Sequence, residues 1–198
     1  MLLSCDVWSP KGGCGKSTIS LTLAGALAVE GYRVLLRDQD AQRSGLMYQA
    51  NAERLGVVVP FDVKASVSDA EADAFDVLIT DHAPGITPVL GGQVCLMPVM
   101  PSFFDYGATV RGEAELREKG RKVLLVPNRI ELNSAGDAAF LAQSFVGRPF
   151  LKKRNPAYKY AISRGLTIFS KNPGLPDVRA ARREFSAVVD ALVSLAAA

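Results

Sequence analysis

The sequence predicts an α/β protein with a doubly wound, mostly parallel sheet and helices on both faces. Short apolar runs alternate with segments of helical periodicity, and a glycine-rich loop joins the first run to the first helix. With 198 residues, 48% of them hydrophobic, the chain is long enough to bury a core without disulfide bonds. We expect a single domain over residues 1–198 that binds its ligands at the carboxyl ends of the strands.

Five apolar runs have the length and composition of buried strands. They comprise residues 2–8, 33–37, 76–80, 94–99 and 122–126. The first two runs flank a helix predicted over residues 16–29, in which Ile19, Leu23 and Leu27 recur at helical spacing. Gly31 follows at the position where a glycine often ends a helix. Strand, loop, helix and strand therefore succeed one another near the start of the chain.

The later apolar runs are also separated by segments that predict helices. Further helices are expected over residues 44–54, 106–119, 135–144 and 177–195. Residues 60–74 have no sustained periodicity and are expected to form a connection with a short helix. The alternation of the two element types is typical of a parallel sheet covered on both faces.

The cysteines and the first residues bear on the compartment. Cys5, Cys14 and Cys95 lie far apart and form no C-x-x-C pair, which is typical of a reducing compartment. The first apolar run has no basic flank and is interrupted by Asp6 and Pro10, so we expect neither a signal peptide nor a membrane span. These observations predict a cytoplasmic protein.

The formal net charge of +3 is unevenly distributed. Residues 1–147 carry 13 Lys and Arg against 17 Asp and Glu, whereas residues 148–198 carry ten against three. The positive charge is therefore concentrated in the last quarter of the chain, which indicates an anionic partner for that quarter.

The glycine-rich loop directly follows the first predicted strand, where residues 10–18 read P-K-G-G-C-G-K-S-T. Glycines let successive backbone N–H groups and the helix N-terminus point at phosphate oxygens. In such a loop the final lysine reaches the β- and γ-phosphates and the hydroxyl after it ligates Mg²⁺. The residues predicted to bind nucleotide are Lys11, Gly12, Gly13, Cys14, Gly15, Lys16, Ser17 and Thr18, with Lys16 on the phosphates and Ser17 on the metal.

The form of this loop is distinctive, because Lys11 precedes the paired glycines and Pro10 stands where an ordinary P-loop has its first glycine. The K-G-G-x-G-K-[ST] pattern resembles the deviant Walker A loop of the ParA/MinD family of P-loop ATPases. The likeness covers residues 2 to about 130 and is strongest to short, ParF-like ParA proteins. It implies ATP and Mg²⁺ as cofactors and an ATP-dependent homodimer in which Lys11 reaches the partner's phosphates, as an arginine finger does elsewhere.

Two carboxylates end the second predicted strand. Asp38 and Asp40 are spaced i, i+2, so both point the same way from the strand end. The segment D-Q-D-A-Q resembles the D-x-D-P-Q segment of the family, with Ala41 in place of the proline. The resemblance implies that Asp40 orients or activates the attacking water and that Asp38 lies near the Mg²⁺ ion. The alternative is a solvated acidic turn.

Residues 76–85 resemble a Walker B strand, in which Asp81 would hold a Mg²⁺-bound water. Ala83 stands where the family has the first of two prolines. His82 is the only histidine, but phosphoryl transfer depends mainly on positioning and charge, so we expect no catalytic role for it. Asn128, before Arg129, matches an asparagine that contacts adenine in relatives; the alternative is a cap at a strand end.

The basic segment, residues 148–183, contains ten cations and one acid, Asp177. Such a segment suits salt-sensitive, sequence-independent contact with DNA phosphates, although an ordinary solvated surface is the alternative. The cations that we predict to contact DNA are Lys152, Lys153, Arg154, Arg182 and Arg183.

The resemblance implies a ParA-like ATPase whose ATP-bound dimer binds nonspecific DNA on the nucleoid. A ParB- or ParG-like partner would stimulate slow hydrolysis, and the cycle would partition a plasmid or chromosome. A MinD-like membrane-positioning ATPase would need a basic amphipathic C-terminal helix, which residues 185–195 lack, so no membrane partner is expected. An iron–sulfur carrier would need more cysteine ligands. An ATP-binding scaffold without hydrolysis stays open because of Ala41 and Ala83.

Overall fold

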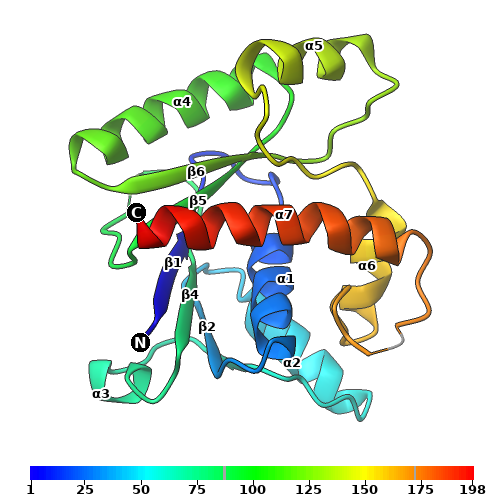
Figure 1. The fold of residues 1–198 in the computed structure, drawn as a ribbon. Coiled ribbons are helices and arrows are strands. Elements are labelled where there is room, and N and C mark those ends of the chain that lie inside the picture. Colours follow the sequence, from blue (N-terminus) through cyan, green and yellow to red (C-terminus); the bar gives the residue numbers. More distant parts are fainter. Residues whose placement is uncertain (87, 172) are drawn as a thin grey trace.

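The computed structural model describes residues 1–86, 88–171 and 173–198 and contains a six-stranded sheet (Figure 1). The strand order is β3-β2-β4-β1-β5-β6, and each pair of neighbours is parallel. Parallel neighbours require crossover connections, and helices provide several of them: α1 joins β1 to β2, α2 joins β2 to β3, α3 joins β3 to β4 and α4 joins β5 to β6. The strands are β1 (Leu3–Val7), β2 (Val34–Asp38), β3 (Asp62–Lys64), β4 (Val77–Asp81), β5 (Val94–Val99) and β6 (Lys122–Pro127).

The helices cover both faces of this sheet. Those of the described residues are α1 (Lys16–Val29), α2 (Ser44–Arg54), α3 (Asp69–Ala72), α4 (Phe103–Glu118), α5 (Ala135–Ser144), α6 (Asn155–Ser163) and α7 (Val178–Ala197). We call the face under α1, α2 and α7 the first face, and the face under α3 and α4 the second face. Figure 1 shows α1 and α2 to the right of β2 and β4, α3 at the lower left and α4 at the top, above β6.

The two faces have separate hydrophobic clusters. On the first face, Leu36 and Ile79 of the central strands pack with Leu23 of α1 and Phe185 of α7. On the second face, a smaller cluster that includes Trp8 lies under α4, and a third cluster of only a few side chains lies under α3. The first face therefore carries most of the core, and cover on the second face is thinnest beside α3.

The predicted fold class is confirmed, and each of the five predicted strands is present with ends within one residue of those expected. Three helices have the predicted bounds, namely α1, α2 and α5. Helix α4 begins earlier than expected, at Phe103, because the Ser102 side chain accepts a hydrogen bond from the Asp105 N–H and caps the helix there. Helix α7 ends two residues later than predicted.

Two elements were not predicted. Strand β3 lies in the segment expected to be a connection, and it buries only Val63 of its three residues, so no apolar run marks it. The short helix expected in that segment is present as α3, which begins with a capping box formed by Ser68 and Glu71. Helix α6 was not predicted either, because among those of its residues whose side chains are described only Ala157 and Ala161 are deeply buried.

The C-terminal helix α7 is amphipathic, and its apolar side faces the protein. Ala181, Phe185, Val188 and Leu192 are fully buried against the first face. Within the described residues, no helix combines the length and the hydropathy that a membrane crossing requires.

Candidate functional site

The loop between β1 and α1 adopts the geometry of a phosphate-binding loop. Gly13 and Gly15 have φ angles of 78° and 95°, in the left-handed region that favours glycine. At Gly15 a side chain is also excluded sterically, because a Cβ atom there would lie 2.6 Å from Nδ2 of Asn128. This backbone leads directly into the N-terminus of α1, where free N–H groups can bind an anion.

Hydrogen bonds from the protein itself hold the loop in shape. The Lys11 N–H donates to Oγ of Ser9 at 3.4 Å, and the Cys14 thiol donates to the Lys11 carbonyl at 3.5 Å. Nδ2 of Asn128 donates to the Cys14 carbonyl at 2.7 Å. The loop is therefore fixed from both sides, which lowers the ordering cost of binding phosphate.

The two lysines of the loop differ in their surroundings. Lys16, at the first position of α1, is only 6% exposed, whereas Lys11 is exposed on the outer side of the loop. No acidic residue lies in the first turn of α1 to neutralise the positive helix end. The Lys16 side chain therefore lies inside the protein, whereas the Lys11 side chain is open to solvent.

The predicted carboxylates meet at the ends of β2 and β4, where Asp38 and Asp81 are register partners on neighbouring strands. Asp38 is fully buried, and its Oδ2 accepts hydrogen bonds from the N–H groups of Gly45 and Leu46, at 2.9 and 3.2 Å. Its Oδ1 accepts one from the Asp40 N–H at 3.2 Å. Asp38 therefore anchors the first turn of α2 and the loop that carries Asp40.

Asp81 has the burial and the unpartnered oxygen that are typical of a carboxylate that binds a cation. It is 1% exposed, and its Oδ1 is buried without a hydrogen-bond partner among the described residues. Burial, with a smaller contribution from the Asp38 carboxylate, raises the pKa of Asp81 to about 6, although hydrogen bonds from Ser17 and Ser20 and the charge of Lys16 oppose this. A carboxylate beside a serine hydroxyl is a donor set that suits Mg²⁺, so these residues fit the metal that the loop implies.

Asp40 is also buried, with 8% exposure, although less completely than Asp38 and Asp81. Its Oδ1 accepts a hydrogen bond from the Gln42 N–H at 2.9 Å, which closes a turn of the kind that aspartate favours. The side chain is held by this turn and by the contact of its own N–H with Asp38. Asp40 is therefore held next to Asp38 by two hydrogen bonds of this turn.

His82, next to Asp81 in the sequence, is paired with a different carboxylate. Its Nε2 is 2.7 Å from Oδ1 of Asp6, and both side chains are buried on the second face. Alternation along β4 puts Asp81 and His82 on opposite sides of the strand end. The histidine is thus a structural partner of Asp6.

A cavity of about 760 Å³ adjoins the loop. It is lined by Gly15 and Thr18 of the loop and helix α1, and by Asn128 and Arg129 after β6. Its remaining wall comes from residues 151–163, which include α6. A cavity of this size beside a phosphate loop can hold a nucleoside. Asn128 lies at its border, and its Oδ1 also accepts a hydrogen bond from the Arg129 N–H at 2.9 Å.

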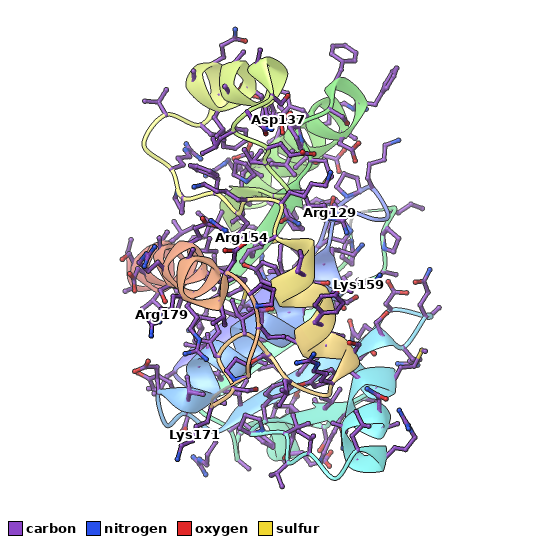
Figure 2. All side chains as sticks on the ribbon, turned by 90° about the vertical axis from the view of Figure 1, so that its right-hand side faces the viewer. Arg129, Asp137, Arg154, Lys159, Lys171 and Arg179 are labelled. Carbon is purple, nitrogen blue, oxygen red and sulfur yellow. The ribbon has the colours of Figure 1, made fainter. Side chains whose placement is uncertain are left out.

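The five cations predicted to contact DNA fall in different environments. Lys152, Lys153 and Arg154 line the cavity beside the loop. The Arg154 guanidinium binds Glu184 at 2.8 Å, and Figure 2 labels it between α6 and α7. Arg182 donates to the carbonyls of Ile168 and Ser170, whereas Arg183 is exposed and has no ion-pair partner in the described part of the chain.

Lys153 is also paired, with Glu131 at 2.6 Å. Its two immediate neighbours share Glu184, since Lys152 lies 3.6 Å from the carboxylate that binds Arg154. Contact of these residues with DNA stays a prediction. The structure also shows that the basic segment borders the cavity beside the phosphate loop. The distribution of charge along the sequence could not indicate this.

Two contributors to the site were not found from the sequence. Ser20, one turn after Lys16, donates to the Lys16 carbonyl at 3.1 Å and lowers the pKa of Asp81 from within α1, but a serine inside a helix carries no motif. Tyr158 of α6 lines the cavity, and its hydroxyl is buried without a partner among the described residues. Burial raises the pKa of Tyr158 above its ordinary range. Finding Tyr158 would have required the prediction of α6.

A sequence profile of the CobQ/CobB/MinD/ParA nucleotide-binding domain matches residues 7–168. That range contains the loop, the carboxylates at both strand ends and the residues that line the cavity. Among curated proteins, none matches the chain.

Solved structures with the same fold have low sequence identity to this chain. A candidate plasmid partition protein of Borrelia burgdorferi B31 bound to AMPPNP has a TM-score of 0.72 at 16% identity, over 96% of this chain and 99% of that one. Cyanothece McdA has a TM-score of 0.71 at 18% identity, over 97% and 100%. MinD of Pyrococcus horikoshii OT3, with Mg-ADP, has a TM-score of 0.65 at 18% identity, over 99% and 95%. These similarities establish the shared fold.

Proposed function

We propose that this chain, which belongs to the family of CobQ/CobB/MinD/ParA nucleotide-binding domains, binds Mg²⁺ and ATP at the β1–α1 loop and hydrolyses the ATP. The observation that carries this proposal is the convergence of Lys16, Ser17 and the unpartnered oxygen of Asp81 at one loop. Structural neighbours with AMPPNP and Mg-ADP bound support the choice of ligand.

Each polar group has a role in this proposal. The loop N–H groups and Lys16 would bind the β- and γ-phosphates, and the nucleoside would lie in the cavity bordered by Asn128. Ser17 and Asp81 would hold Mg²⁺, with Asp38 nearby fixing the loop between them and α2. The metal, when bound, neutralises charge that develops on the phosphates. Asp40 would orient the attacking water.

We further propose that ATP closes a homodimer across the loop. Lys11 supports this step, because it is exposed at the rim of the site while Lys16 already serves the site from within. A second positive charge supplied by a partner chain would stabilise the transferred phosphoryl group as an arginine finger does.

The cellular role that we propose is DNA partitioning, with hydrolysis stimulated by a ParB- or ParG-like partner. The basic segment 148–183 supports contact with nonspecific DNA. A membrane-positioning role is less well supported, because the apolar side of α7 is buried against the sheet and cannot enter a lipid surface.

The hydrolysis proposal is tested by phosphate release from Mg-ATP. Wild-type protein should show slow turnover, and Asp40→Ala should reduce it at least about a hundredfold while leaving ATP bound. Asp62→Ala, which removes an exposed carboxylate from the neighbouring edge strand, is the matched control and should retain turnover. ATP binding without measurable turnover in the wild type would instead identify a nucleotide-binding scaffold.

The dimer proposal is tested by light scattering with ATP, ADP and no nucleotide. The mass should double with ATP alone, and Lys11→Ala should stay monomeric although it still binds ATP. A molecular mass that is the same with ATP, with ADP and without nucleotide would contradict the proposal that ATP closes a homodimer. Pelleting with anionic liposomes in the presence of ATP would favour the membrane-positioning alternative.

A further inference from the structure

A second cavity, of about 320 Å³, lies on the second face of the sheet. Its floor is formed by Ser4, Arg37, Leu78 and Thr80 of the three central strands. Its walls include α3, Met1, Val67, Gly91 and Gly92. The volume is at the lower end of the range for small-molecule sites, which is roughly 300–1,000 Å³. It is separate from the nucleotide site, because Arg37 and Thr80 alternate with Asp38 and Asp81 along their strands and face the other way.

The floor of this cavity is polar where a parallel sheet is ordinarily apolar. Strands covered on both faces normally carry aliphatic side chains on both. Here Ser4, Asp6 and Thr80 face the second side of the sheet at 9%, 1% and 2% exposure, next to the half-buried Arg37. Departures of this kind from a simple apolar pattern concentrate at functional sites.

The Arg37 guanidinium carries an uncompensated charge. Its Nε and Nη2 both donate to Oγ1 of Thr80, at 3.2 and 3.0 Å. Among the described residues, no carboxylate lies within 4.0 Å of it. A half-buried cation without an anionic partner is costly, and a bound anion would remove that cost.

Asp6, the nearby buried carboxylate, is already satisfied by other groups. Its oxygens contact His82 and accept a hydrogen bond from the Gly92 N–H at 2.7 Å, and Arg121 lies 3.8 Å away. Arg121 also donates to the Gly92 carbonyl, so the Gly92 peptide is held from both sides. A Cβ atom at Gly92 would lie 2.8 Å from Asp6 Oδ2, so only glycine fits. The wall of the cavity is therefore preformed.

We propose that this cavity binds a small aminocarboxylate. The Nη1 side of the Arg37 guanidinium, which Thr80 does not contact, and the hydroxyl hydrogen of Thr80 match a carboxylate. Val67, Ala72 and Leu78 provide an apolar wall for an aliphatic segment. At the rim, the exposed Asp69 and Asp73 have no ion-pair partner among the described residues. They favour an ammonium group at the other end of the ligand and repel phosphates. The site would operate independently of the nucleotide chemistry.

The test uses nucleotide-free protein, so its outcome does not depend on ATP binding. Backbone amide resonances of Gly91 and Gly92 are followed by NMR while 4-aminobutyrate, butyrate or inorganic phosphate is added. We expect 4-aminobutyrate to shift these resonances saturably and to bind more tightly than butyrate or phosphate. Arg37→Met, which keeps the aliphatic stem, should weaken its binding at least about tenfold. The control Arg33→Met changes an exposed arginine of the same region and should bind normally.

A second variant tests the proposal even if Arg37→Met does not fold. Asp69→Asn combined with Asp73→Asn changes only exposed side chains, and it should weaken 4-aminobutyrate while leaving butyrate unaffected. The proposal is overturned if no probe shifts Gly91 and Gly92, if binding persists unchanged in Arg37→Met, or if butyrate or phosphate binds as tightly as 4-aminobutyrate.

Discussion

The phosphate loop and the basic C-terminal segment are both rich in charged and polar groups, but these groups differ in burial and in their partners within the protein. In the loop region the charged side chains of Lys16 and Asp81 are buried and converge on one small volume, and an oxygen of Asp81 stays unpartnered. In the basic segment several cations are bound by the chain itself, as Arg154 is by Glu184. Charges that the fold leaves uncompensated point to ligands, whereas charges that it pairs internally contribute mainly to structure.

The largest effect is expected at the loop. Lys16→Ala removes a buried cation from the phosphate position and should lower the affinity for Mg-ATP about a thousandfold, a loss typical of a positioned group that stabilises phosphate charge. Titration calorimetry measures this, with Lys119→Ala at the exposed end of α4 as the control. A Lys16→Ala protein that binds Mg-ATP like the wild type would place the nucleotide elsewhere.

The next largest effect concerns Asp81 and pH. Because the pKa of Asp81 in the folded protein, about 6, lies above the ordinary aspartate value of 3.8, ionising this carboxylate opposes folding. Below about pH 4 the carboxyl is protonated in both the folded and the unfolded protein, so it does not lower the free energy of unfolding. As the pH rises, ionisation lowers the free energy of unfolding, and above pH 6 the loss is complete, at about 3 kcal/mol. Asp81→Asn should therefore stabilise the nucleotide-free protein by up to that amount at pH 7.5 and hardly at pH 4. Urea denaturation at several pH values measures the difference, and a pH-independent difference would contradict this explanation.

A smaller loss of stability is expected in the basic segment. Glu184→Ala leaves Arg154 without its partly buried partner and should lower the free energy of unfolding by about 2 kcal/mol. Glu131→Ala breaks the exposed pair with Lys153 and should cost less than about 1 kcal/mol. If both variants lost the same free energy of unfolding, the burial of an ion pair would not determine its contribution to stability in this protein.

The smallest effect is expected at a single exposed cation. If the ATP-bound protein contacts DNA phosphates, Arg183→Ala should reduce the dependence of log affinity on log salt by about one unit. Fluorescence anisotropy of a labelled duplex at several salt concentrations measures this slope. Arg154→Ala serves as a comparison. Because Arg154 is paired with Glu184, this substitution should lower the free energy of unfolding more than it lowers DNA affinity. An unchanged slope in Arg183→Ala would remove this residue from the interface.

The sequence predicted the fold class and the local motifs well, because both depend on neighbouring residues. The strand ends at Asp38 and Asp81 and the glycines of the loop follow from short patterns. It did not predict α6, whose few buried residues give no periodic signal, nor the cavity that α6 lines. The pairing of Arg154 with Glu184 joins residues 30 positions apart, so no local pattern could indicate it. The cavity above Arg37 depends on strand order in the same way.

Binding of a labelled DNA duplex with ATP, ADP and no nucleotide most directly tests whether the loop controls the basic segment. With ATP and Mg²⁺ the wild type should bind, and affinity should fall steeply as salt rises. Binding should be lost with ADP and in Lys11→Ala, which is expected to bind ATP without dimerising. DNA binding that is equal in all nucleotide states, or absent although ATP is bound and hydrolysed, would contradict the proposal that the two regions act together in partitioning.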